Sequence, residues 1–401
     1  MTDIKFEVLK KVGNIDFKSQ SFKNISKINS ISPPSVFVGS GLKYPNMNVG
    51  ILSPIEKDEN AWVYDDCKYW AENDFGISDI VRLRESLLNS RAVQKAKDVR
   101  FTNKFLGIAR EIAISSKPVD VEIELKRKIE FNSKRDRVLM PSAIGAPIEN
   151  AKITSNVSVD RQLDKVLNDD LKAQAGISQL YKNNFNEYTL SKILSIGALG
   201  LQKDKKLVPT RWSITATDDI ICKYILSNVR NYKEIENFSF TFGEFLGNQY
   251  LIFFFPGVFS FELFELYFPG SSWNPSDQIK ASTDFEFFSG RKEYASQCAG
   301  GYYATRLAVV EYLELIRRQA NVLVIRLETP SYFASLGVWV VRESVRKALN
   351  RKFMNFNSKE ELLSSGKKIG LIKYNFDAQA LFDRSELLKY LTSQKSLKDF
   401  F

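Results

Sequence analysis

The sequence predicts an α+β fold, with a mixed, largely antiparallel sheet and surrounding helices. Segments of alternating, β-branched or aromatic residues neighbour one another along the chain and do not alternate strictly with helical segments. Other segments repeat apolar residues at steps of three and four, as amphipathic helices do. With 401 residues, of which 44% are hydrophobic, the chain can form one large domain or two closely packed subdomains.

The expected elements follow from these two periodicities. The first 31 residues are rich in Lys, Asn and Ser and predict a polar tail, flexible or loosely docked. The predicted helices are 77–96, 159–181, 186–196, 218–231 and 302–321. The predicted strands are VDVEIEL (119–125), ENFSFTFG (236–243), QYLIFFF (249–255), VFSFELFELYF (258–268), NVLVIRLE (321–328) and KIGLIKY (368–374).

The expected domain organisation has four parts. The loop FPGSSWNPSDQ separates a larger body, 32–275, from a smaller one, 276–392. The polar tail, 1–31, precedes them, and a terminal peptide, 393–401, follows a last helix in which Asp383 is the expected cap.

The most apolar stretch, LIFFFPGVFSFELFELYF at 251–268, is a poor membrane span. Pro256 and Gly257 interrupt it, and Glu262 and Glu265 lie inside it, so it predicts a β-hairpin. The first residues, MTDIKFEVLKKVGN, lack the apolar core of a signal peptide, and the three cysteines show no disulfide spacing. We therefore expect a cytoplasmic protein without a membrane partner.

Charge and residue usage narrow the chemistry. The chain has 57 Lys and Arg against 47 Asp and Glu, a net charge of +10, which suits a polyanionic partner such as DNA. It has no histidine, so Ser-His and Cys-His nucleophile pairs are excluded. The cysteines form no C-x-x-C zinc site, and the sequence assigns no metal ligand with certainty.

Several basic residues are candidates for binding DNA or phosphate. Arg84 and Arg91 belong to a basic stretch expected to lie on the 77–96 helix, where exposed charges can neutralise a DNA backbone. The alternative is a solvated helix face with local ion pairs. Gly300 and Gly301 precede a helix whose first N–H groups can receive a phosphate, with Arg306 one turn further on. The remaining members of this set are Arg318, Arg342 and Arg346.

The stretch VPTRWSITATDD offers a second kind of site. Arg211 and Trp212 are expected on a strand, where arginine can hold a phosphate and tryptophan can stack on a base. Asp218 and Asp219 are expected to open a helix capped by Thr217, and could hold a divalent cation in an enzyme acting on a nucleotide or phosphodiester. Acidic residues that only stabilise the helix dipole are the alternative.

The sequence ends in QKSLKDFF, a Q-x-x-L-x-x-F-F pattern formed by Gln394, Leu397, Phe400 and Phe401. A single helical turn would place Leu397 and both rings on one side. The pattern resembles the peptides by which DNA replication and repair proteins dock on the sliding clamp (PCNA). In such peptides the Gln side chain enters a small polar pocket, and the apolar residues fill a hydrophobic one. The alternative is that the rings pack on the protein itself.

The body is similar to the archaeal Nre family of DNA-repair proteins. The resemblance lies in SPPSVFVGSGLKYPNMNVG (32–50), VPTRWSITATDD (208–219) and the stretch 300–346, and it covers nearly the whole chain from Ser32 onward. It implies repair of damaged DNA in association with the clamp. The cysteine-rich segment of some members has no counterpart before Cys67. A nucleotide-processing enzyme and a non-catalytic clamp adaptor remain the alternatives.

Overall fold

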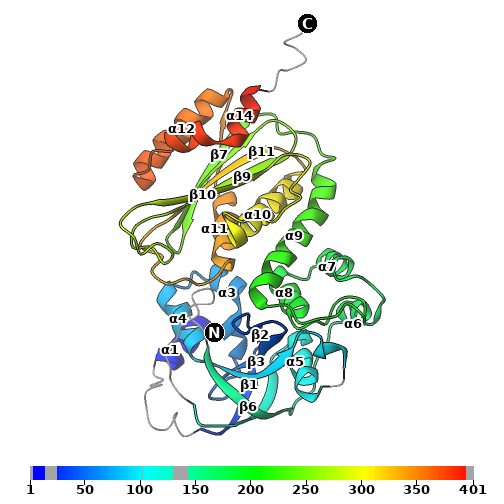
Figure 1. Cartoon of the computed structure of the whole chain (residues 1–401). Helices are drawn as coiled ribbons and strands as arrows, with labels where there is room; N and C mark the ends of the chain where they lie inside the picture. Colours follow the sequence, from blue (N-terminus) through cyan, green and yellow to red (C-terminus); the bar gives the residue numbers. More distant parts are fainter. Residues whose placement is uncertain (1–2, 14–24, 102, 130–142, 394–401) are drawn as a thin grey trace. The chain divides into compact units, whose positions relative to one another are not determined.

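The computed structural model describes residues 3–13, 25–101, 103–129 and 143–393 (Figure 1). The chain divides into two compact units, Met1–Ile221 and Cys222–Phe401, and the boundary falls inside helix α9 (Thr210–Val229). Within the described residues each unit has one mixed six-stranded sheet. The predicted α+β class is therefore confirmed. The domain boundaries predicted from sequence stay a prediction.

The sheet of the first unit has the strand order β1-β5-β6-β4-β3-β2. Every neighbouring pair is antiparallel except β4 and β6, which run parallel. The predicted strand VDVEIEL is confirmed as β5. The strands are β1 (Lys27–Ser32), β2 (Val36–Val38), β3 (Asn46–Pro54), β4 (Leu87–Lys95), β5 (Val119–Leu125) and β6 (Ile144–Ile153).

Helix α5 (Lys104–Ile114) packs on this sheet against β2, β3 and β6. It begins where the Asn103 side chain accepts a hydrogen bond from the Leu106 N–H at 3.0 Å, and it buries Leu106, Ala109 and Ile112. The other helices of the unit are α1 (Ile4–Gly13), α3 (Cys67–Glu72), α4 (Ile77–Glu85), α6 (Arg161–Asn168), α7 (Ala173–Lys182), α8 (Glu187–Ser195) and the 3₁₀ turns η1 (Ala61–Asp65) and η2 (Asp98–Arg100).

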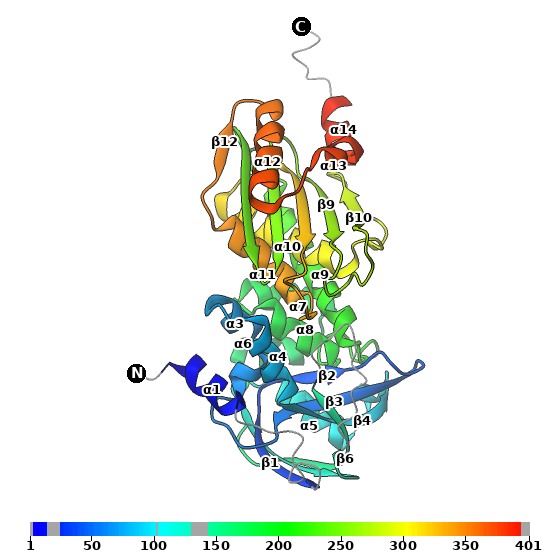
Figure 2. The ribbon, with the colours of Figure 1, turned by 90° about the vertical axis from the view of Figure 1, so that its left-hand side faces the viewer.

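Residues 1–31, expected to be a polar tail, include two ordered elements. Helix α1 buries Val8 and Val12 and lies beside α4 (Figure 2). Strand β1 pairs with β5, from Lys27 opposite Glu124 to Ser32 opposite Val119. The apolar residues are few but spaced to face one side, so a polar composition did not prevent docking.

The helix predicted at 77–96 is wrong in its second half. Helix α4 ends at Glu85, and Leu87 begins β4, which pairs with β3 along its whole length. Asn89 and Ser90, both weak helix formers, lie buried in that strand. Arg91 and Lys95 therefore lie on a strand. Of the other predicted helices in this unit, 186–196 is confirmed as α8, and 159–181 is two helices, α6 and α7, separated at Asp169 to Lys172.

The sheet of the second unit has the order β10-β9-β11-β8-β7-β12. The predictions for 236–243, 249–255, 258–268 and 321–328 are confirmed as β7, β8, β9 and β11 within two residues at each end. The predicted hairpin at Pro256 and Gly257 is wrong, because β11 lies between β8 and β9 and pairs with both. The strands are β7 (Phe238–Phe245), β8 (Asn248–Phe255), β9 (Ser260–Tyr267), β10 (Lys280–Glu286), β11 (Asn321–Glu328) and β12 (Met354–Phe356).

Helices cover both faces of this second sheet (Figure 1). One face carries the core of Leu251, Phe253, Ile325 and their neighbours, packed under α12 (Lys359–Tyr374), α13 (Gln379–Arg384) and α14 (Glu386–Ser393). The other face meets α10 (Ala299–Ile316) and α11 (Trp339–Leu349). The sheet is therefore the middle layer of three.

The strand predicted at 368–374 is instead the last part of α12. Ser358 begins this helix by accepting a hydrogen bond from the Glu361 N–H at 3.1 Å. A β-carbon at Gly366 would lie 2.2 Å from the Phe253 ring, so the helix approaches β8 closely there. KIGLIKY contains enough β-branched residues to suggest a strand, but the capped segment before it propagates as a helix.

The carboxylate of Glu262 on β9 holds the start of α14. It accepts hydrogen bonds from the Ser385 hydroxyl and from the N–H groups of Glu386 and Leu387, the latter two at 3.1 Å. Ser385 also caps the helix by accepting from the Leu388 N–H at 3.1 Å, so the cap predicted at Asp383 is wrong. A buried carboxylate thus satisfies N–H groups that a helix start leaves open.

Burial raises the pKa of Glu262 above its ordinary value, although the three hydrogen bonds oppose the shift. The folded state then binds this proton more tightly than the unfolded state, whose carboxyl pKa is about 4.3. The part of the stability that depends on this proton is therefore complete below that value and is lost as pH rises through the folded-state pKa, while the three hydrogen bonds to Glu262 remain. We expect Glu262→Gln, which cannot titrate, to weaken the fall in unfolding free energy over this range. Urea unfolding at a series of pH values measures it, and parallel profiles for parent and variant would contradict it.

Candidate functional site

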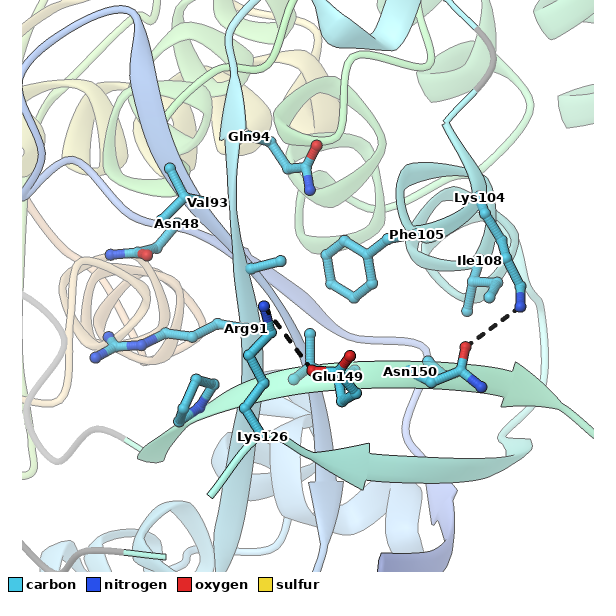
Figure 3. A pocket seen from close by; sticks show the side chains of 14 residues that line it. Asn48, Arg91, Val93, Gln94, Lys104, Phe105, Ile108, Lys126, Glu149 and Asn150 are labelled. Carbon is cyan, nitrogen blue, oxygen red and sulfur yellow. Dashed lines mark hydrogen bonds and ion pairs between the residues drawn. The ribbon is translucent and has the colours of Figure 1, made fainter. Parts of the chain in front are cut away.

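A pocket of about 570 Å³ opens where the sheet of the first unit divides (Figure 3). Strand β6 pairs with β4 only up to Arg91 opposite Pro147, and from Ile148 opposite Leu125 it pairs with β5. Proline has no N–H to continue the ladder, so Pro147 suits the point at which β6 changes partner. The last residues of β4 and the second half of β6 therefore separate and leave a cavity.

Side chains from four elements, β3, β4, α5 and β6, and from the residue after β5 line this cavity. The Phe105 ring on α5 projects into its middle in Figure 3, with Gln94 of β4 on one side and Asn150 of β6 on the other. Gln94 is oriented by a hydrogen bond from Asn103, 2.9 Å from Nδ2 to Oε1. The apolar lining residues are Ala92, Val93, Phe105, Ile108, Pro147, Ile148 and Ala151, and the amide side chains are Asn48, Gln94 and Asn150.

The cavity has a cationic rim. Arg91, Lys104 and Lys126 line it against one carboxylate, Glu149. Lys126 Nζ lies 3.9 Å from Glu149 Oε2, and both side chains are about 60% exposed. Lys104 Nζ lies 3.3 Å from Asn150 Oδ1. Exposed contacts of this kind contribute little stability and exchange readily with an incoming anion, so the rim stays available to a negatively charged ligand.

Arg91 owes its place to a glycine on the neighbouring strand. A β-carbon at Gly145 of β6 would lie 2.8 Å from Cζ of Arg91. The guanidinium therefore rests on the bare backbone of β6, at the edge of the pocket, and remains exposed. Any larger residue at position 145 would displace it.

Of the arginines predicted to bind DNA, Arg84 has a structural role. Its Nη2 lies 3.5 Å from Asp65 Oδ1 and from the Cys67 sulfur, and its guanidinium lies 5.2 Å from the Trp70 ring centroid. Its side chain is only 15% exposed. The same surroundings bury Cys67, and burial raises the pKa of that thiol to about 12, so it is a poor nucleophile.

Arg211 and Trp212 lie in the first turn of α9, not on a strand. The helix starts directly after Pro209, whose carbonyl accepts from the Trp212 N–H at 2.8 Å. Both side chains are exposed, and the guanidinium lies 5.6 Å from the indole ring centroid. The pair remains a candidate for a phosphate and a base.

Asp218 and Asp219 do not open a helix, because α9 begins at Thr210, so the expected cap at Thr217 is wrong. Asp218 is fully buried and Asp219 half-buried, both inside the helix. Within the described ranges no group of three or more Cys, Asp or Glu residues is placed to hold a metal ion.

Gly300 and Gly301 lie inside the first turn of α10. A β-carbon at Gly301 would lie 2.2 Å from Glu265 Oε1, so this glycine admits a buried carboxylate. Arg306 is also buried, with Nη1 2.7 Å from Glu286 Oε2. The predicted phosphate site at this helix is therefore occupied by the protein's own acidic residues.

The other predicted arginines of the second unit do not form a common cationic face. Arg342 is buried within α11. Arg346 pairs with Glu311 at 2.9 Å and with Glu343 at 2.7 Å. Arg318, half-buried after α10, donates to the carbonyl of Arg317 at 3.1 Å. Much of the basic charge here is thus paired locally.

The centre of the second unit holds a buried ionic network around Arg326. Its guanidinium lies 2.6 Å from Glu265 Oε1 and 2.9 Å from Glu328 Oε2, and it donates to Asn248 Oδ1. The Tyr267 hydroxyl donates to the other oxygen of Glu265 at 2.8 Å. Arg326, Glu265 and Glu328 are all at most 5% exposed, so each charge depends on its neighbours for solvation.

Of the pocket residues, the sequence analysis singled out Arg91 and missed the others, among them Gln94, Lys104, Phe105, Lys126 and Asn150. Lys104 and Lys126 belong to the basic stretch that contains Arg84 and Arg91, and that stretch was the available signal. The predicted clamp-binding residues Gln394, Leu397, Phe400 and Phe401 lie outside the described residues. Among the helices that are described, none is both long and apolar enough to cross a bilayer.

Comparisons with known proteins give a consistent result over both units. The family described as "Archaeal Nre, N-terminal" matches residues 4–274, and "Archaeal Nre, C-terminal" matches 286–400. DNA repair protein NreA of Haloferax volcanii is 39% identical over 321 residues, 79% of this chain and 76% of its own. No solved structure gives a significant match.

Two proteins of Archaeoglobus fulgidus are similar over more of the chain. DNA repair protein NreA is 39% identical over 343 residues, 86% of this chain and 85% of its own. DNA repair protein NreB is 33% identical over 360 residues, 89% of this chain and 88% of its own. The chain is thus a two-unit α+β protein that is similar to DNA repair proteins of archaea. It belongs to the archaeal Nre family.

Proposed function

We propose that this protein is a DNA-repair factor that docks on the sliding clamp through its C-terminal peptide and contacts DNA through its basic body. One observation carries the proposal: the Q-x-x-L-x-x-F-F pattern at Gln394, Leu397, Phe400 and Phe401, in a chain whose relatives are named DNA repair proteins. The net charge of +10 supports the contact with DNA.

Docking would depend on three apolar side chains and one amide. Burying Leu397, Phe400 and Phe401 in a hydrophobic pocket contributes roughly 1.5–3 kcal/mol each, while ordering the peptide costs part of that gain. Gln394 adds hydrogen bonds that fix the register. These opposing effects suggest a micromolar dissociation constant, which corresponds to a binding free energy on the order of −8 kcal/mol.

The peptide follows α14 directly, so the clamp contact would be tethered to the folded second unit. Tethering raises the effective concentration of DNA near the body to about the millimolar range when linkers are short. Weak, salt-dependent contacts between basic side chains and phosphates then suffice to keep the protein on DNA.

The test is calorimetric titration of the full chain with the clamp. We expect Phe400→Ala with Phe401→Ala to abolish measurable binding, because two of the three apolar anchors are lost. Ser396→Ala, at a position outside the Q-x-x-L-x-x-F-F pattern, is the matched control and should leave the dissociation constant within about twofold. An unchanged titration for the double variant would overturn the proposed docking.

A further inference from the structure

The side chains that line the pocket between β4, β6 and α5 complement the chemical features of one class of ligand. Its wall is apolar and includes the ring of Phe105, its amides come from Gln94 and Asn150, and its rim carries Lys104 and Lys126. A ligand that fits must have a flat apolar part, hydrogen-bonding edges and negative charge close beside them. A nucleotide has all three features. Its base can stack on an aromatic ring, the edges of the base can form hydrogen bonds with amides, and its phosphate can pair with the lysines.

The size and shape of the pocket select an unstacked nucleotide over a duplex. Its volume of about 570 Å³ falls within the range of small-ligand sites, about 300–1,000 Å³. In a duplex the bases are stacked inward and the convex backbone faces outward, so a duplex would reach only the rim. A single strand can turn one base inward while its backbone follows the cationic edge.

The placement of the cations on different elements supports a strand running across the opening. Lys104 begins α5, Lys126 follows β5, and Arg91 lies on β4 over Gly145, so the charges come from three sides of the cavity. Lys104 and Lys126 can therefore contact phosphates on either side of Phe105, whereas the Arg91 side chain points away from Phe105 on the other side of β4 (Figure 3). Glu149 lies beside Lys126 and would favour a base over a second phosphate at that point.

We propose that this pocket binds single-stranded DNA by receiving one unstacked base against Phe105, with the flanking phosphates held by Lys104 and Lys126. The proposal rests on the proposed function in that it names the form of DNA contacted by the body. It does not require the clamp, so the two can fail separately.

The test uses the full chain without the clamp and a fluorescent oligothymidylate of about 12 nucleotides, within the usual site size of about 4–16. Anisotropy should show tighter binding to this strand than to a duplex of equal length. Phe105→Leu keeps an apolar side chain and removes the stacking ring, so we expect affinity for the strand to fall about 5–100-fold. The dependence of affinity on salt should stay unchanged in that variant.

Lys104→Gln and Lys126→Gln test the phosphate contacts by a second readout. Each should make the negative slope of log affinity against log salt concentration shallower by about 0.7, the value for one phosphate contact on a single strand. Lys68→Gln, which removes an exposed lysine from α3, should change neither slope nor affinity. Because these lysines are exposed, their variants keep the test valid even where Phe105→Leu lowers the unfolding midpoint.

Three outcomes would overturn the proposal. Equal affinity for strand and duplex with no effect of Phe105→Leu would mean that only the surface charge binds DNA. Unchanged salt slopes in both lysine variants would place the contact elsewhere. Binding of thymidine monophosphate but not of the oligonucleotide would make the pocket a site for a free nucleotide. Loss of clamp binding in Phe400→Ala with Phe401→Ala, alongside normal oligonucleotide binding, would support both proposals independently.

Discussion

Replacing Arg326 with methionine is expected to lower the free energy of unfolding by about 3–5 kcal/mol. The change removes the guanidinium that pairs with both Glu265 and Glu328, two carboxylates that are at most 1% exposed. Two buried carboxylates would then face each other without compensation, and Asn248 would lose its donor. Methionine keeps much of the volume, so the loss measures charge more than packing. Urea unfolding followed by tryptophan fluorescence gives the number.

Two controls separate this effect from the loss of any arginine. Arg346→Met breaks ion pairs whose side chains are 10–25% exposed, and should cost about 1 kcal/mol. Adding Glu265→Gln and Glu328→Gln to Arg326→Met removes the uncompensated charge and should recover much of the stability, since uncharged replacements for buried ion networks are often tolerated. A loss near that of Arg346→Met would contradict the network's role.

Replacing Glu262 with alanine is expected to lower the free energy of unfolding by about 2–4 kcal/mol. The Ser385 hydroxyl and the N–H groups of Glu386 and Leu387 lose their acceptor, and hydrogen bonds to a charged group contribute about 1.5–3 kcal/mol each before compensation by water. The start of α14 should then exchange its amide hydrogens faster than the rest of the second unit. Urea unfolding and hydrogen exchange provide the two measurements.

The matched control for Glu262→Ala is Glu386→Ala. The Glu386 carboxylate pairs with Lys389 at the surface, where both side chains are about half exposed, so its loss should cost no more than about 0.5 kcal/mol. Clamp affinity should stay within about twofold in both variants, because the four residues of the peptide carry that contact in the proposed function. Equal destabilisation by the two changes would show that α14 is held by other contacts.

Five of the twelve strands in the described residues were predictable from sequence, because their signal is local. Alternating or continuous β-branched and aromatic residues identified five strands, from VDVEIEL to NVLVIRLE. Their partners were not predictable, since Pro256 and Gly257 suggested a hairpin whereas β11 separates the two strands. Pairing depends on residues more than 50 positions away, which short-range periodicity does not encode.

Errors in helix assignment had the same origin. The stretch 77–96 repeats apolar residues well enough to suggest one helix, yet β3 supplies a partner that makes its second half a strand. KIGLIKY reads as a strand in isolation, yet the cap at Ser358 and the fit of Gly366 against Phe253 make it helical. Tertiary contacts outweigh propensities of a few tenths of a kcal/mol per residue.

By itself, the sequence determined the α+β class, the absence of histidine chemistry, the excess of positive charge and the linear Q-x-x-L-x-x-F-F pattern. These properties reside in composition or in residues adjacent along the chain. Only the tertiary structure decided which basic residues are available. It buries Arg306, Arg326 and Arg342, brings Lys104 and Lys126 to the pocket that contains Phe105, and leaves Arg91 exposed at the edge of that pocket. The reason is physical, because a charge's pairing and solvation depend on its neighbours in space.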